Sequence, residues 1–157
     1  MNRDKGVLST LESFATNKKS GYERESGAMG YQSLATVLGA PSVPLLLPSL
    51  TVLYDLLMDK GDVVRAAASA AIKTILKLCP PESVPVVFHH LEAILENGKW
   101  RSKVGALDGI KGFATSARDA VASEISEILP HIEKAMHDTK SEVCSLLPSS
   151  LADTETI

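Results

Sequence analysis

The chain restarts one short sequence pattern at nearly regular intervals, and this repetition limits the folds open to it more than any other feature. Three expected helices each begin close to an arginine, namely Arg24, Arg65 and Arg101. The helices that begin near Arg65 and Arg101 each follow a short polar turn. These arginines are 41 and 36 residues apart, and a similar opening recurs 43 residues after the third, at Cys144. Between these points apolar residues recur at three- and four-residue steps, as in amphipathic helices. The sequence therefore predicts a chain of repeated helical units.

Repeats of this length are typical of antiparallel helix pairs that stack into a solenoid. Spacings of 36 to 43 residues bracket the period of HEAT and armadillo repeats, in which each pair packs on the next along a continuous core. We predict an all-α fold, a HEAT-type α-solenoid of about three to four antiparallel helix pairs. The alternative is a four-helix bundle, because four helices joined by short turns give a similar local pattern. The restarted motif favours the solenoid, since a bundle has no reason to repeat it.

Prolines, glycines and polar turns set the expected helix boundaries. Helices are expected over residues 22–38 and 63–78, and Asp62 is expected to be the N-cap of the second of these. Pro130 is expected to kink or split the last long helix. Three of the predicted buried stripes are Val7, Leu8, Leu11, Phe14 and Ala15; Val84, Val87, Phe88, Leu91, Ile94 and Leu95; and Trp100, Val104, Leu107, Ile110 and Ala114.

The repeat pattern weakens toward the C-terminus. We expect the HEAT-repeat domain to cover residues 1–147, with an incomplete last repeat, and a polar tail to follow over 148–157. An incomplete repeat leaves its last helix uncapped, which predicts apolar surface around Ile128, Ile132 and Met136 and a route to self-association. The alternative is that the last residues fold back as an irregular cap.

Charge, hydropathy and cysteine content exclude several classes of protein. The formal net charge of -3 excludes nucleic-acid binding through the whole surface, although local basic patches are compatible with it. The longest apolar stretch, residues 43–58, is interrupted by prolines and is too short to span a bilayer, so no membrane contact is expected. No secretory signal is expected, because no apolar segment follows residues 1–5. Cys79 and Cys144 fit inert thiols in a reducing compartment, and we expect a cytoplasmic protein.

No group of side chains predicts catalysis, a metal or a cofactor. His89 and His90 are adjacent on a helix and point about 100° apart, so with Glu92 they do not form a metal site. His131 and His137 are six residues apart and fit a metal site no better. The sequence also lacks a Gly-x-Ser-x-Gly elbow and a Cys/His pairing. We therefore expect a non-enzymatic protein without cofactors.

A basic cluster surrounds Trp100 at the start of a helix. Lys99, Arg101 and Lys103 flank the indole, an arrangement that suits phosphate binding or stacking on a base. The alternative is that Trp100 packs between repeats while the charges only solvate the turn.

Lysines also occupy equivalent positions in successive turns. Lys60, Lys99 and Lys140 all fall between paired helices, so a stack is expected to align them along one ridge. Such a ridge suits rRNA or an acidic protein face, although neighbouring acidic residues such as Asp59 weaken its field. The predicted partner contacts are therefore Lys60, Lys99, Trp100, Arg101, Lys103 and Lys140.

Three segments resemble the N-terminal HEAT repeats of fungal translation elongation factor 3. They are residues 58–68, 95–104 and 136–143, and they also resemble the HEAT region of the large scaffold that activates the amino-acid-starvation kinase on ribosomes. The resemblance covers about residues 22–143. Its most specific parts are Asn-Gly-Lys-Trp-Arg-Ser-Lys and Asp-Thr-Lys-Ser-Glu-Val.

This resemblance implies a surface that contacts the ribosome, through rRNA or a ribosomal protein, or other translation-associated proteins. In elongation factor 3 itself, ATP is hydrolysed by cassettes further along the chain. The present sequence contains no Gly-x-x-x-x-Gly-Lys-Ser/Thr phosphate loop, so the ATP-driven role is not carried over. The alternative is a stand-alone regulator or decoy that binds proteins and has no link to the ribosome.

Overall fold

Helices account for the regular structure of the described part of the chain. A computed structural model describes residues 3–136, and within that range no strand is formed. The α-helices are α1 (Arg3–Ala15), α2 (Gly21–Leu38), α3 (Val43–Leu46), α4 (Leu50–Leu56), α5 (Asp62–Leu78), α6 (Val84–Asn97), α7 (Trp100–Ser116) and α8 (Arg118–Met136). Short 3-10 helices cover Ala40–Ser42, Leu47–Ser49 and Pro81–Ser83. No helix in this range is both long and apolar enough to cross a membrane.

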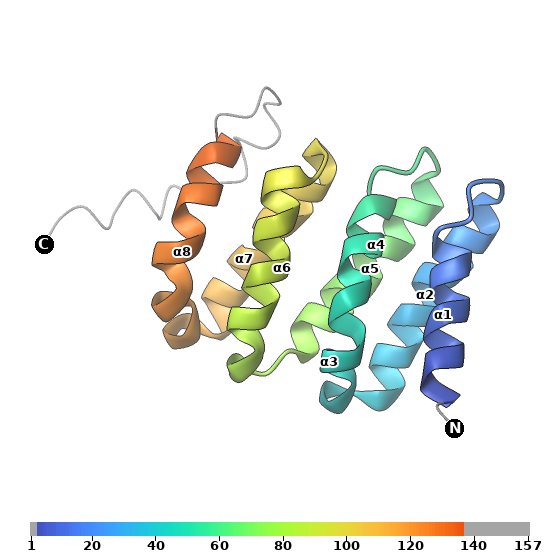
Figure 1. The fold of residues 1–157 in the computed structure, drawn as a ribbon, viewed down its shortest axis with the longest axis horizontal. Coiled ribbons are helices and arrows are strands. Elements are labelled where there is room, and N and C mark those ends of the chain that lie inside the picture. The colour runs from blue at the N-terminus through green and yellow to red at the C-terminus, as the bar shows by residue number, and fades with distance from the viewer. Residues whose placement is uncertain (1–2, 137–157) are drawn as a thin grey trace, which may run out of the picture.

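The helices lie in two layers and run alternately up and down (Figure 1). One layer contains α1, α3 with α4, α6 and α8 in order, and the layer behind it contains α2, α5 and α7. The pairs are therefore α1 with α2, α3–α4 with α5, and α6 with α7, followed by α8. This arrangement confirms the HEAT-type solenoid, because a four-helix bundle does not extend as a row of stacked pairs.

One hydrophobic core runs along the stack from Ala15 in α1 to Ala135 in α8. All six residues of the stripe predicted for α6 are buried, from Val84 to Leu95. This stripe has the helical spacing throughout and uses large side chains only, so its burial follows from the pattern.

Some residues of the predicted buried stripes are exposed to solvent. Val7 and Phe14 in α1 are 50% and 40% exposed, because α1 is the terminal helix of its layer and has a neighbour on one side alone. In α7, Ala114 is exposed and Phe113 is buried in its place. The larger aromatic ring removes more apolar area from water than the methyl group does.

The predicted N-cap of the second long helix is wrong, and so is one of the two outcomes expected at Pro130, a split of the last helix. Gly61 is the N-cap of α5, and Asp62 is the first residue inside the helix. Pro130 does not split α8, which is continuous from Arg118 to Met136. Burial of Ile128 and Ile132 on either side of the proline explains the continuity, because tertiary packing offsets the hydrogen bond lost at Pro130.

The prediction of exposed apolar side chains at the end of the stack is also wrong for two of its three residues. Ile128 is 0% and Ile132 is 3% exposed, because α8 packs on both α6 and α7. The basis for self-association at these positions is therefore absent. The structure does not describe the side chain of Met136 or any of residues 137–157. Predictions for His137, Lys140, Cys144, the domain end at 147 and the polar tail therefore lie outside the described residues.

Candidate functional site

Three inter-helix turns lie along one edge of the stack. The turns at residues 16–20, 57–61 and 98–99 are at the upper edge in Figure 1, whereas the connections at 39–42, 79–83 and 117 are at the lower edge. We call the upper turns, with the first residues of the helices that follow them, the turn edge (residues 16–24, 57–65 and 98–103). Because successive helices run in opposite directions, every second connection lies on the same side of the stack. The fold itself therefore brings these three turns to one edge.

An ion pair joins the first two turns of this edge. Arg24 Nε lies 2.6 Å from Asp59 Oδ2, and its Nη2 donates to Asp59 Oδ1 at 3.3 Å. The same guanidinium donates from Nη1 to the carbonyl oxygen of Asn17 at 2.7 Å. Both charged side chains are nearly buried, with 12% and 9% exposed for Arg24 and Asp59. The pair therefore fixes the position of one repeat on the next.

The hydrogen bond from Arg24 lowers the pKa of the Asp59 carboxyl below its ordinary value. Partial desolvation opposes this shift, and the Gly61 N–H, which donates to Oδ1 at 2.8 Å, adds to it. Asp59 is therefore a carboxylate at neutral pH, and Arg24 stays paired with it.

Arg65 closes its own turn instead of reaching the next repeat. Its Nη1 donates to the carbonyl oxygens of Asp59 at 2.7 Å and Lys60 at 3.1 Å, and its Nη2 pairs with Asp62. The repeated arginines of the sequence thus share a position, within the first four residues of α2, α5 and α7, and differ in their contacts. Arg24 and Arg65 have structural roles, so neither supplies an unpaired charge to a partner.

Lysines supply the accessible positive charge of the turn edge. Lys60 is exposed, and with Lys18 and Lys19 it borders a shallow hollow of about 350 Å³ between the first two turns. Tyr22, which is 78% exposed, lines the same hollow. Lys18, Lys19 and Tyr22 were not among the contacts predicted from the sequence. Aligning the first turn with the second would have revealed them, because Lys18 and Lys19 lie in the turn equivalent to that of Lys60 and Tyr22 is the second residue of the helix that follows.

The cluster around Trp100 is partly packed into the fold. Trp100 is half-buried against the hydrophobic core, and the Arg101 guanidinium lies 4.8 Å from the centre of its ring. Lys99 is exposed, whereas Lys103 is half-buried. The turns that carry Lys60 and Lys99 are on the same edge, and Lys140 lies outside the described residues.

Four of the lysines on the turn edge have exposed ammonium groups, although the charge of Lys60 also acts on the nearby Asp59 carboxylate. Among the residues that the structure describes, Lys18, Lys19, Lys60 and Lys99 form no ion pair, and all four are exposed. Exposed ammonium groups attract phosphate or carboxylate groups of a partner without first breaking a contact. The turn edge therefore offers a row of available cations.

The described histidines and cysteine have local contacts within the stack, and His131 Nδ1 lies 3.4 Å from Glu96 Oε1. His89 Nδ1 is 3.9 Å from Glu92 Oε2, and partial burial lowers the pKa of His90. Between residues 3 and 136, no three potential ligands come together to hold a metal ion. Cys79 Sγ donates to the carbonyl oxygen of Ile75 at 3.3 Å, and burial raises the pKa of this thiol to about 11. Its thiolate is scarce near neutral pH.

Comparisons with known proteins place this geometry in a family context. A family model described as the EF3 N-terminal HEAT repeat matches residues 1–145. The mRNA export factor elf1 of Schizosaccharomyces pombe is 38% identical over 141 residues, which is 88% of this chain and 13% of that protein. Elongation factor 3 of Zygosaccharomyces rouxii is 30% identical over 121 residues, 75% of this chain and 12% of its own length.

A third relative is the eIF-2-alpha kinase activator GCN1 of Dictyostelium discoideum. It is 26% identical over 140 residues, which covers 87% of this chain and 5% of that protein. The chain therefore spans only a small part of the length of each of these relatives.

Proposed function

Because the chain belongs to the EF3 N-terminal HEAT repeat family, we propose that it is a non-enzymatic contact module that binds the ribosome through the turn edge. HEAT stacks of this kind present long surfaces to large partners. The relatives include an elongation factor and an eIF-2-alpha kinase activator, which supports a role in translation. The proposed place of action is the cytoplasm.

The row of unpaired lysines is the observation that carries this proposal. Lys18, Lys19, Lys60 and Lys99 present positive charge along one edge of a chain whose net charge is -3. Lysines in such a row bind phosphates of an RNA backbone and release counterions, which makes the interaction dependent on salt. The exposed ring of Tyr22 lies beside them and offers a face for an unpaired base.

Reversing the charges of the turn edge is expected to weaken ribosome binding. In the variant Lys18→Glu/Lys60→Glu/Lys99→Glu, three cations become anions, and co-sedimentation with ribosomes at about 0.1 M salt should fall at least about tenfold. The changed side chains are exposed, so the fold should persist. The matched control, Lys73→Glu/Lys77→Glu/Lys111→Glu, alters the net charge equally on α5 and α7 and should sediment as the parent chain does.

Two results would count against ribosome binding through this edge. One is the absence of co-sedimentation by the unaltered chain, and the other is an equal loss in both triple variants. Pull-down from lysate before and after nuclease treatment separates the alternative role. Binding that survives nuclease and charge reversal would indicate a protein-only regulator or decoy.

A further inference from the structure

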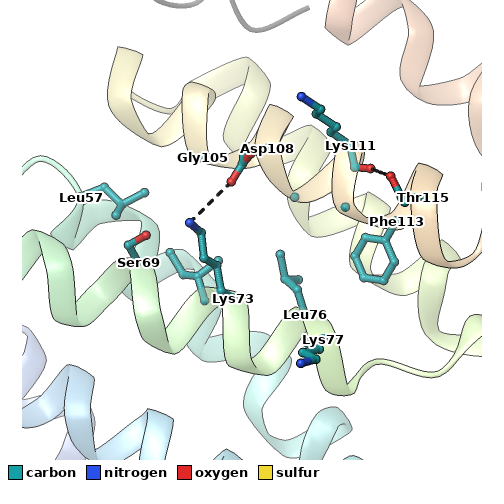
Figure 2. Close-up of a pocket in the computed structure, with 13 residues that line it drawn as sticks. Leu57, Ser69, Lys73, Leu76, Lys77, Gly105, Asp108, Lys111, Phe113 and Thr115 are labelled. Carbon is teal, nitrogen blue, oxygen red and sulfur yellow. Dashed lines mark hydrogen bonds and ion pairs between the residues drawn. The ribbon is translucent and has the colours of Figure 1, made fainter. Parts of the chain in front are cut away.

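The layer formed by α2, α5 and α7 contains a cleft of about 550 Å³ between α5 and α7 (Figure 2). Its surface is mainly apolar and includes Ile72 and Leu76 of α5 and Phe113 of α7. Figure 2 shows Lys73 extending from α5 toward Asp108 on α7, across the opening. Leu57 is the one cleft-lining residue that also belongs to the turn edge, and none of Lys18, Lys19, Lys60 and Lys99 lines the cleft. A role for the cleft is therefore independent of the lysines that carry the proposed function.

The shape of the cleft is set by how α7 approaches the repeat before it. Near the N-terminal end of α7, the hydroxyl of buried Ser102 donates to the carbonyl oxygen of Tyr54 at 2.8 Å. A Cβ added at Gly105 would lie 2.8 Å from Leu57 Cδ1, so the two repeats are in close contact there.

Toward the C-terminal end of α7, the distance between this helix and the preceding repeat increases. A Cβ at Gly109 would lie 3.0 Å from Leu76 Cδ1, whereas a Cβ at Gly112 would meet nothing within 4 Å. These positions share one face of the helix, because four- and three-residue steps return to the same side. The cleft therefore widens toward the C-terminal end of α7, and Gly112 borders open space.

The rim of the cleft is positively charged. Lys73, Lys77 and Lys111 line it, and Asp108 is the one acidic residue among its lining residues. Lys73 Nζ is 4.0 Å from Asp108 Oδ2, with 70% and 52% of the side chains exposed. An ion pair this long and this exposed contributes little stability and exchanges readily for a partner's carboxylate.

We propose that this cleft binds an acidic amphipathic helix of a partner protein. Apolar side chains at i, i+3 or i+4, and i+7 would occupy the space over Ile72, Leu76 and Phe113, while flanking Asp or Glu side chains would pair with the lysines. From Gly105 to Thr115 the wall is about 15 Å long at 1.5 Å per residue, which matches a helical segment of about ten residues. The apolar lining does not suit a nucleic acid, whose backbone is charged throughout.

Selection from a displayed library of random 12-residue peptides on the intact chain tests this proposal. The recovered peptides should combine helically spaced apolar residues with Asp or Glu. Their affinity, measured by fluorescence anisotropy, should fall at least about tenfold in Lys73→Glu/Lys111→Glu. It should fall similarly in Gly112→Leu, which fills the widest part of the cleft. Lys18→Glu/Lys60→Glu/Lys99→Glu on the turn edge should bind as the parent chain does.

Several outcomes would overturn the proposal. They are the recovery of basic peptides, the recovery of no peptides, or equal binding by the parent and both cleft variants. Displacement of the peptide by single-stranded RNA as effectively as by unlabelled peptide would assign the cleft to RNA instead. Thermal unfolding of Gly112→Leu checks its fold, which should persist because leucine favours the helix more than glycine does. The lysine variant changes exposed residues only and gives a second, independent measurement.

Discussion

Replacing Asp59 with alanine is expected to lower the free energy of unfolding by about 2–3 kcal/mol. The change removes both contacts with Arg24 and leaves that guanidinium, which is 12% exposed, with only its hydrogen bond to the Asn17 carbonyl. It also removes the acceptor of the Gly61 N–H. Urea denaturation followed by circular dichroism measures the loss. Asp55→Ala, at an exposed carboxylate of α4, is the control and should change stability by less than about 0.5 kcal/mol.

The same residue gives stability a dependence on pH. The pKa of Asp59 is lower in the folded chain than in the unfolded one, chiefly because Arg24 donates to the carboxylate. Its stabilisation is therefore complete above the unfolded value, about 4, and is lost as pH falls through the folded value. The difference in stability between the parent chain and Asp59→Ala should shrink on acidification below about pH 4. Parallel pH curves would contradict the assignment.

Phe88→Ala is expected to be the most damaging single substitution in the third pair, with a loss of about 3–5 kcal/mol. Phe88 is 2% exposed, and its ring meets that of Phe113 edge to face, with centroids 6.1 Å apart. Truncation leaves a cavity where α6 and α7 meet. Because domains are stable by about 5–15 kcal/mol in total, we expect a much lower unfolding midpoint in urea.

Val86→Ala provides the matched control on the same helix. Val86 is 53% exposed, so its truncation removes little buried surface, and alanine favours the helix more than valine. Its unfolding midpoint should stay close to that of the parent chain. Equal effects of the two substitutions would show that α6 does not bury the face that contains Phe88.

The local pattern of the sequence was sufficient for the architecture and for part of the core. The spacing of Arg24, Arg65 and Arg101 predicted the stacked pairs, and the stripe of α6 predicted its buried face. Both depend on short-range periodicity, which a single sequence displays directly. Of the two outcomes expected at Pro130, a kink or a split, the split was wrong, because burial of Ile128 and Ile132 depends on neighbouring helices.

The local sequence pattern could not predict contacts between residues that are far apart in the sequence. Arg24 and Asp59 are 35 residues apart, and neither the motif nor its spacing marks them as partners. The cleft was missed for the same reason, since its width depends on how α7 lies against α5. The lysines of the turn edge were only partly found, because Lys60 and Lys99 are in recognised turns whereas Lys18 and Lys19 precede the first recognised repeat. Their role in partner contact stays a prediction.

Hydrogen exchange, measured by mass spectrometry with and without bound ribosomes, is the most direct test of the turn edge as the contact surface. Exchange of backbone amides should slow in residues 16–24, 57–65 and 98–103, and it should be unchanged in the connections at 39–42 and 79–83 on the opposite edge. Slower exchange on the opposite edge alone, or no change at any turn while ribosomes are bound, would contradict the proposed contact.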